Sequence, residues 1–522
     1  MDSIAEKIIA DDEQALKIRK GQEKGVPEGK QLTTFKHWRK VVSDYAQRKR
    51  EEFFKQLILD GMEEKKAQAE SHKPLSPLTV ACYMADLLHV CRIESDEGEK
   101  PVYFYNPDEG LYKHDLEFLK DFISVLEPRH NEKKAYDCLY ALKRQAPYRQ
   151  VEENDQYIMV GNGIYNRKIR QLEPFTWERI FTSKVKTAYK AEATSPIIKG
   201  WEFESWLKDL FAGDEELYQL TLQLLNAAIR GRSLDKMFWF VGTGGTGKGT
   251  LQELFTNLIG RENVASIKIT DLDIHNRFTL SQAIGKRAII GDDVQAGAIL
   301  RDTSKLFSLV SGDMVSVERK KKDAYSTYLK TVVIQSTNGL PRMVGDSNAI
   351  KRRMVILPFR NSFTGKPNRA IKEDYLKRPK VLEYVLKLII DLDYKDFIQP
   401  KLSAEQMEEY QRGIDPVLTF IEELFGNAIS VFLPNDFVWW YFSNFAEYNG
   451  HEHNYNLQTL NTRLKENLPE EWEKTRHPVT VPAGADFPKG FYPKEDTAGY
   501  MNRTYRPPKA KTSRGYRKKN RK

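Results

Sequence analysis

The sequence predicts a multidomain α/β protein whose central module is a parallel β-sheet covered by helices. At 522 residues the chain is too long for one hydrophobic core. Residues 233–365 alternate apolar, strand-like runs with helical patterns, which is typical of a parallel sheet. Polar segments with helical periodicity stand on both sides of this stretch. We therefore expect further modules before and after a central α/β core.

Composition places the chain among soluble proteins. Hydrophobic residues make up 40% of it and charged residues 30%, and no run of 18 apolar residues is long enough to cross a membrane. The N-terminus has neither the basic flank nor the long apolar core of a secretory signal. The three cysteines are too few for a disulfide framework. We expect a cytoplasmic protein with no membrane partner.

Positive charge is concentrated near the C-terminus. The net charge is +9, yet residues 503–522 contain ten Lys or Arg and no acidic residue, which leaves −1 for the rest of the chain. This stretch mixes basic residues with Pro, Gly and Ser. We therefore expect residues 501–522 to be a disordered basic tail that is attracted to polyphosphate.

Two modules and a helical segment are expected before the central sheet. Residues 1–75 have the pattern of a basic or polar helical segment, and residues 76–195 that of an α+β domain with short strands. Residues 214–231 predict a helix that begins after the capping residue Asp214 and is apolar on two sides. Such a helix packs against more than one element. We expect residues 196–232 to form a helical collar or oligomerisation segment.

A glycine-rich turn between a strand and a helix is the most informative feature. An apolar run at 237–241 precedes it, and an amphipathic helical pattern begins at 251. Glycines let the backbone curl so that successive N–H groups face phosphate oxygens, and the helix N-terminus favours an anion. The lysine adds a point charge for the β- and γ-phosphates. We expect a nucleoside triphosphate to be bound by Gly242, Thr243, Gly244, Gly245, Thr246, Gly247, Lys248, Gly249 and Thr250.

The residue after the lysine departs from the usual form of this motif. Ser or Thr normally stands there as a Mg²⁺ ligand, whereas this chain has Gly249 followed by Thr250. We expect Thr250 to take the metal role. Because the GKGT spelling also occurs in adenylate kinases, a small-molecule kinase stays open as an alternative.

Two later strand-like runs end in polar residues. The first ends in Asp292, which fits the role of holding Mg²⁺, and Asp293, which fits that of the base that polarises the attacking water. The second, at 331–338, ends in Asn338, whose amide can reach the γ-phosphate or that water. A guanidinium from Arg352 or Arg353 can stabilise charge on the transferred phosphoryl group, and the choice between the two stays open.

The segment from 311 to 359 resembles the helicase module of superfamily 3, and within it the phage and plasmid primase–helicase family, which is similar to poxvirus primase–helicases. The resemblance is strong over 233–365 and weaker on both sides. The shared features are Ser311-Gly312-Asp313, the basic residues Lys320, Lys321 and Lys322, Thr337-Asn338, Leu340-Pro341, the stretch 346–353 and the strand end at 357–359.

The resemblance implies an AAA+ type P-loop ATPase and helicase domain at 233–400 and a winged-helix-like DNA-binding domain at 401–500. Such a protein is an ATP hydrolase that uses Mg²⁺ and acts as a DNA helicase or replication initiator of a phage, plasmid or other mobile element in a bacterial host cell. Its implied partners are single-stranded and duplex DNA. An arginine that reaches a neighbouring subunit's ATP implies a ring, a homo-hexamer that translocates on single-stranded DNA.

DNA contacts are expected in two places. In the rings of this superfamily a hairpin points into the central channel, and Lys320, Lys321 and Lys322 lie at the matching position, where lysines would contact phosphates rather than bases. Residues 434–468 predict two helices across an Asn-Gly turn. On the second helix, the residues that could face a DNA groove are Thr459, Asn461, Thr462, Arg463 and Lys465.

Two alternatives of function stay open. A bifunctional primase–helicase needs paired metal-binding carboxylates on a strand, and residues 1–200 contain no convincing pair, so we expect a primase to be a separate protein. An ATP-switched DNA-binding initiator without unwinding activity stays open because Asp293 stands where many such ATPases have Glu.

Overall fold

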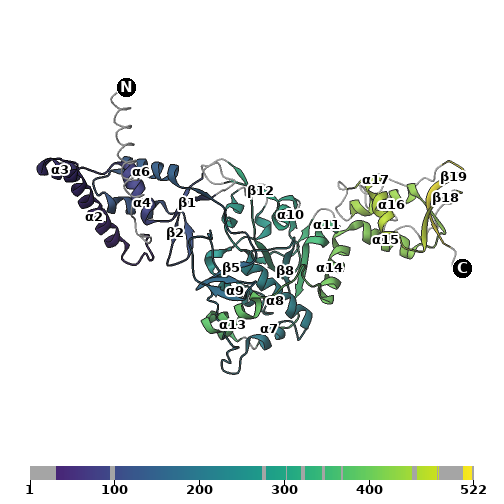
Figure 1. Cartoon of the computed structure of the whole chain (residues 1–522). Coiled ribbons are helices and arrows are strands. Elements are labelled where there is room, and N and C mark those ends of the chain that lie inside the picture. Colours follow the sequence, from purple (N-terminus) through teal and green to yellow (C-terminus); the bar gives the residue numbers. More distant parts are fainter. Residues whose placement is uncertain are drawn as a thin grey trace. The chain divides into compact units, whose positions relative to one another are not determined.

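The computed structural model describes residues 31–93, 100–272, 278–300, 302–318, 324–343, 347–365, 368–448, 455–478, 480 and 509–519 (Figure 1). Within them, contacts divide the chain into two compact units. The first comprises the residues up to 296, 304–339 and 357–400, and the second 297–303, 340–356 and the residues from 401 onward. In this described part of the chain, no helix is long and apolar enough to span a membrane.

The first unit begins with helices around a small mixed sheet. The helices are α2 (Trp38–Leu59), α3 (Glu64–Ser71), α4 (Pro77–Leu87), α5 (Leu116–Leu126) and α6 (Glu132–Gln145), and the sheet, ordered β3-β2-β1-β4, contains β1 (Val90–Ile93), β2 (Val102–Asn106), β3 (Leu111–Lys113) and β4 (Tyr148–Arg149). Val42 and Tyr45 of α2 are buried in the same cluster as Val80 and Phe122. The boundary predicted at residue 75 therefore divides one hydrophobic core.

A three-stranded antiparallel sheet and two helices follow. The strands are β5 (Tyr157–Val160), β6 (Gly163–Asn166) and β7 (Gln171–Glu173), and the helices are α7 (Phe203–Leu210) and α8 (Glu215–Arg230). As predicted, Asp214 caps α8 by accepting a hydrogen bond from Leu217 N at 2.9 Å. Both apolar sides of α8 are buried within this chain, where α8 packs against α7, α9 (Lys248–Ile259) and α13 (Pro379–Ile390). The two-sided pattern that suggested an oligomerisation segment is accounted for by this internal packing.

The central sheet has five strands in the order β16-β8-β14-β10-β9. They are β8 (Met237–Val241), β9 (Val264–Ala265), β10 (Ala288–Val294), β14 (Val332–Thr337) and β16 (Met354–Pro358). The pairings β8–β14, β14–β10 and β10–β9 are parallel. Phe238, Ile289 and Ile334 are fully buried, because a parallel sheet that is covered on both faces requires apolar residues throughout its strands. The predicted multidomain α/β architecture with a parallel sheet is confirmed.

Short elements surround this sheet. Helix α10 (Ser304–Ser311) leads into an antiparallel hairpin of β12 (Met314–Val317) and β13 (Tyr325–Tyr328), and α12 (Arg369–Glu373) precedes α13. Val315 and Val317 are buried, whereas Met314 and Ser316 are exposed. The period of two in β12 therefore leaves one side of the hairpin to the solvent.

The second unit combines short parallel strands with a helical module. It contains β11 (Ile299–Leu300), β15 (Arg342–Met343), α11 (Ser347–Arg353), α14 (Lys401–Ile414), α15 (Pro416–Asn427), β17 (Phe432–Pro434), α16 (Asn435–Tyr448), α17 (Leu457–Asn467), β18 (Trp472–Pro478) and β19 (Thr512–Lys518). The last three strands form an antiparallel sheet in the order β17-β19-β18. Trp472 and Tyr516 from this sheet close the core over Phe425.

Strand β19 shows that part of the expected disordered tail, residues 501–522, is ordered, while 501–508 and 520–522 lie outside the described residues. Tyr516 is 1% exposed. A Cβ at Gly515 would collide with the carbonyl oxygen of Leu433, so only glycine allows β17 and β19 to approach this closely. Among the basic residues of Thr512–Lys518, the buried Tyr516 and the closely packed Gly515 hold the strand in the sheet.

Candidate functional site

The glycine-rich turn connects β8 to α9 at the carboxyl edge of the central sheet. Helix α9 begins at Lys248, so its first backbone N–H groups are available to a ligand held by the turn. Gly247 has a φ of +92°, a left-handed conformation that side chains disfavour. A Cβ at Gly242 would lie 2.5 Å from the carbonyl oxygen of Phe359. Glycine is therefore required at both positions.

Lys248 joins the turn to the end of β14. Its Nζ donates to the carbonyl oxygens of Gly242 at 2.5 Å and Thr243 at 2.8 Å, and to Asn338 Oδ1 at 3.1 Å. Burial lowers the pKa of Lys248, whereas the charges of Asp293 and Asp292 oppose that shift. The structure thus brings together four residues that the sequence predicted separately, and the ammonium group lies among them.

The two carboxylates stand on a bulge at the end of β10. The β10–β14 register shifts between Gly291 and Val294, and Asp293 has a φ of +52°. Ser336 Oγ donates to Asp292 Oδ1 at 2.7 Å and accepts from Asp293 N at 3.1 Å. A single buried hydroxyl from β14 therefore holds the Asp292 carboxylate and the Asp293 backbone, and both aspartate side chains are exposed at the sheet edge. The sequence analysis gave Ser336 no such role.

A buried glutamine of β14 packs against this bulge. Gln335 is fully buried; its Nε2 donates to Ile267 O at 3.1 Å and its Oε1 accepts from Ile269 N at 3.0 Å. A Cβ at Gly291 would collide with the Gln335 side chain. Gln252 of α9 donates to Gly291 O at 3.2 Å. The sequence signal for this supporting role is a glutamine inside an otherwise apolar strand, because a buried amide needs hydrogen-bond partners.

The remaining residues of the turn lie as the motif predicts. Thr246 is buried and its hydroxyl donates to Thr243 O at 2.9 Å. Thr250 stands on the first turn of α9, where its N–H donates to Gly247 O at 3.0 Å. A Cβ at Gly249 would lie 3.6 Å from Lys372 Nζ of α12, which adds a basic group beside this helix end that the sequence analysis missed.

The segment after β16 lies against the glycine-rich turn. Phe363 N donates to Gly245 O at 3.0 Å, and Asn361 Nδ2 donates to Asp209 O at 2.7 Å. A Cβ at Gly247 would lie 2.6 Å from Leu210 Cδ2 and 3.8 Å from the Phe363 ring. One side of the turn therefore has an apolar wall made by two segments distant in sequence.

The other predicted residues belong to the second unit or lie outside the described residues. Arg352 and Arg353 end α11 in the second unit; Arg352 is exposed, and Arg353 Nη1 donates to Ala349 O at 3.4 Å. Lys320, Lys321 and Lys322 are outside the described residues, although β12 and β13 on either side form the hairpin that the sequence predicted.

The donor set suits a magnesium ion that is shared with a nucleotide. Among the described residues, no three His, Cys, Asp or Glu side chains converge as a protein-only metal site. Mg²⁺ commonly uses one or two carboxylates together with substrate phosphates. Asp292, oriented by Ser336 at the sheet edge, fits this coordination preference, and Thr250 offers a hydroxyl on the first turn of α9.

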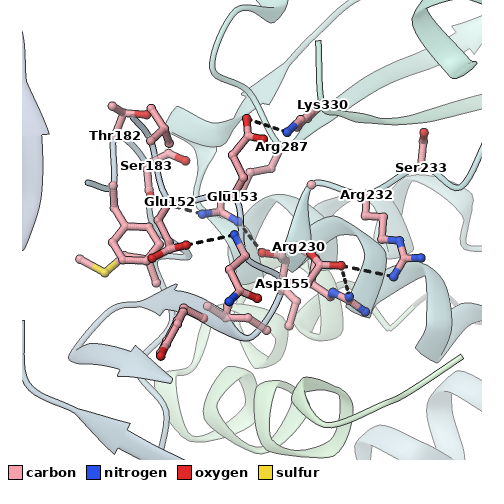
Figure 2. Close-up of a pocket in the computed structure, with 18 of the residues that line it drawn as sticks. Glu152, Glu153, Asp155, Thr182, Ser183, Arg230, Arg232, Ser233, Arg287 and Lys330 are labelled. Atoms are coloured by element: carbon pink, nitrogen blue, oxygen red, sulfur yellow. Dashed lines mark hydrogen bonds and ion pairs between the residues drawn. The ribbon is translucent and has the colours of Figure 1, made fainter. Parts of the chain in front are cut away.

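A cavity of about 470 Å³ opens at the opposite, amino edge of the sheet (Figure 2). Asp155 bridges Arg230 at 2.5 Å and Arg232 at 3.4 Å, and Glu153 lies 2.9 Å from Lys330. Burial lowers the pKa of Arg287 to about 10, and this guanidinium donates to the backbone oxygens of residues 229 and 183. Every acidic group named here is matched by a base, so we interpret the cavity as a structural junction.

Three family models match successive parts of the chain. A "D5 N terminal like" model matches residues 30–212, a "family of unknown function (DUF5906)" matches 240–353, and a "Poxvirus D5 protein-like" model matches 412–506. The first and third lie outside the segment in which the sequence resemblance is strongest.

Solved structures of the NrS-1 C-terminal region are also similar. Its A-form apo structure shares 14% sequence identity, covers 76% of this chain and 85% of that chain, and has a TM-score of 0.45. A second apo structure, of its residues 305–718, shares 15% identity over 76% and 86% of the two chains at a TM-score of 0.44. A TM-score below 0.5 does not establish a common fold.

Proposed function

Since this chain is a D5-like protein of the primase–helicase type, we propose that it is an ATP-dependent DNA helicase, or replication initiator, that translocates on single-stranded DNA as a ring. The family indicates an enzyme that acts on DNA in replication. ATP hydrolysis on an AAA+ type P-loop core, with Mg²⁺, is our proposal for the source of energy.

The convergence at the carboxyl edge of the central sheet carries this proposal. Lys248 donates to Asn338 Oδ1 at 3.1 Å, and its pKa responds to the charges of Asp292 and Asp293. Parallel α/β sheets bind ligands at this edge. A lysine, two carboxylates and an amide around a helix N-terminus are the groups that phosphoryl transfer to water requires.

Each residue then has a distinct role. The N–H groups of 243–249 hold the phosphates, and Lys248 exchanges the carbonyl oxygens of the turn for phosphate oxygens. Asp292 and Thr250 would hold Mg²⁺, which would supply positive charge to offset that of the phosphates. Asp293 accepts a proton from the attacking water, and Asn338 orients that water. The Ser336 hydroxyl holds the Asp292 carboxylate and the backbone of Asp293 in place during turnover.

An arginine from a neighbouring subunit completes the site in this proposal. Arg352 is the better candidate, because its side chain is exposed whereas that of Arg353 is partly buried. A guanidinium supplied in trans requires a closed ring, and we propose a homo-hexamer. The positive charge of this guanidinium, beside the transferred phosphoryl group, couples hydrolysis to the subunit interface.

DNA is proposed to contact the hairpin and the C-terminal module. Lys320, Lys321 and Lys322, which stand between β12 and β13 in the sequence, are proposed to contact phosphates. In the C-terminal module, the order helix, strand, helix, helix, strand, strand with the sheet order β17-β19-β18 is that of a winged helix. Helix α17 exposes Thr459, Thr462 and Lys465 for a groove.

Steady-state hydrolysis with and without single-stranded DNA tests this function. We expect DNA-stimulated ATP hydrolysis in the wild type and a loss of at least about a hundredfold in Lys248→Ala, because a positioned phosphate-binding cation is removed. Lys286→Ala is the matched control, since Lys286 Nζ donates to Glu262 O at the start of β10, away from the turn. Full activity in both variants would refute the assignment of the site.

Other products of the same reactions identify the alternatives. ATP-dependent assembly on DNA without hydrolysis would favour a switched initiator. Primer synthesis from nucleoside triphosphates would favour a bifunctional primase–helicase. Phosphoryl transfer to AMP would favour a kinase.

A further inference from the structure

Helix α11 is attached to the C-terminal module through a buried polar cluster. Ser347, the first residue of α11, donates from Oγ to Asp415 Oδ2 at 2.7 Å and accepts from Arg463 Nη2 at 2.7 Å. Arg463 also pairs with Asp415 directly. We call Ser347, Asp415 and Arg463 the α11 anchor. It joins the start of α11 to α17 and to the residue that precedes α15.

Burial restricts the three side chains of the α11 anchor to this arrangement. Asp415 is 2% exposed, Arg463 is 15% exposed and Ser347 is 3% exposed. The second oxygen of Asp415 accepts from Val417 N at 2.9 Å and caps α15, while Gln411 Nε2 donates to Ser347 O at 3.1 Å. A desolvated carboxylate with these partners tolerates few alternative arrangements, because each lost partner leaves a buried polar group unsatisfied.

The anchor corrects the expected role of Arg463. The sequence analysis placed this residue among those that face a DNA groove. Its guanidinium instead lies against Asp415 and Ser347, whereas Thr459, Thr462 and Lys465 are on the exposed side of α17. Leu460 and Leu464 occupy the buried side. Arg463 therefore connects the back of α17 to α11.

Helix α11 also carries the arginines assigned above to the neighbouring subunit's nucleotide. Arg352 lies five residues after Ser347, which is about 7.5 Å along a helix axis. A seven-residue helix has little stability of its own, so its direction depends on what holds its first turn. Ile350 of the same helix is fully buried.

We propose that Arg463 is a positioning residue that couples DNA bound along α17 to the arginine that α11 presents in trans. The inference rests on the function proposed above. DNA on the exposed side of α17 orders that helix, Arg463 transmits its position to Ser347 through Asp415, and Arg352 is thereby held for the adjoining site. Hydrolysis would then respond to DNA at the C-terminal module as well as at the hairpin.

The test compares full-length variants of the anchor with a matched control. Arg463→Met removes the guanidinium from the anchor. The double variant Asp415→Asn/Arg463→Met removes both buried charges, so that neither is left unpaired. Arg463→Lys keeps the positive charge but lacks the planar guanidinium. Arg412→Met, which changes an exposed arginine of α14, is the matched control outside α17. We expect kcat of DNA-stimulated hydrolysis to fall at least about tenfold in the first two, because displacement of a catalytic group by about 1 Å costs up to a hundredfold. KM for ATP should change less than about twofold, and Arg463→Lys should recover part of kcat.

Subunit mixing supplies a readout that a purely structural role would not move. Lys248→Ala subunits keep their arginines, so mixing them with Arg463→Met subunits should restore hydrolysis, as it should with Arg352→Ala/Arg353→Ala subunits. Restoration in both mixtures supports the proposal. No restoration with Arg463→Met, although the arginine variant is restored, would overturn it. Unchanged kcat with only a lower Tm would also overturn it. A wild type that hydrolyses no ATP would overturn the proposed function and this inference with it.

Discussion

Glu127 stabilises the N-terminal core through a buried carboxylate. Its side chain is 0% exposed, and it accepts from Arg50 Nη2 at 2.5 Å, Leu75 N at 2.9 Å and Arg129 Nε at 2.7 Å. Burial raises the pKa of Glu127, but the hydrogen bonds from Arg129, Leu75 and Arg50 outweigh it and bring the pKa from 4.5 to about 2. The residue joins α2, the chain before α4 and the end of α5.

The shift predicts how the stability of this core depends on pH. A difference of 2.5 units, at 1.36 kcal/mol per unit, corresponds to about 3 kcal/mol of free energy of unfolding. Because the folded-state pKa is lowered, this contribution is complete above pH 4.5 and is lost as pH falls toward 2. Glu127→Gln should remove the dependence in that window and lower stability at neutral pH, since the two arginines lose their carboxylate.

Urea unfolding read by pulsed hydrogen exchange of peptides from α4 to α6 measures this core separately from the rest of the chain. Glu117→Gln is the control, because Glu117 is 85% exposed and pairs with nearby Lys120 at 3.2 Å in the same helix. Wild type and Glu117→Gln should lose about 3 kcal/mol between pH 4.5 and pH 2. Equal pH dependence in Glu127→Gln would refute the reasoning.

Three further changes probe the catalytic edge, the junction and the C-terminal sheet. Gly291→Ala should lower kcat at least about tenfold and destabilise by about 1–3 kcal/mol, because the added methyl displaces Gln335 beneath the aspartates; unchanged hydrolysis would contradict this. Asp155→Asn should lower thermal stability by about 1–3 kcal/mol, because Arg230 is only 3% exposed and loses its ion pair; an unchanged melting curve would argue against a structural junction. Tyr516→Ala should destabilise the C-terminal unit by about 3–5 kcal/mol in urea unfolding read by hydrogen exchange, as expected for a buried aromatic residue; unaltered protection of β18 would show that β19 is dispensable.

The central sheet could be predicted because its information is local. The runs at 237–241, 287–293 and 331–338 correspond to β8, β10 and β14, since strands that are buried on both faces must be apolar along their length. The glycine-rich turn could be located for a similar reason: its required φ values and close contacts restrict residue type within a few positions. The resemblance to poxvirus primase–helicase-like proteins is confirmed by the two D5-type family models.

Other features depend on which segments meet, and no local pattern encodes that. Ser336 matters because the β10 bulge lies beside it. The two apolar sides of α8 reflect neighbours inside the chain, although the same pattern would suit an interface between subunits.

The position of Arg463 on the second predicted helix favoured a contact with DNA, whereas the fold brings Asp415 to it and makes it an internal ion pair. Tyr516 and Gly515 anchor a basic strand that composition had assigned to disorder. Backbone conformation and continuous burial restrict the residue type at each position, so they can be predicted from the sequence. The partner of a charge or of an apolar face is chosen by three-dimensional packing between distant segments, and only the folded chain reveals it.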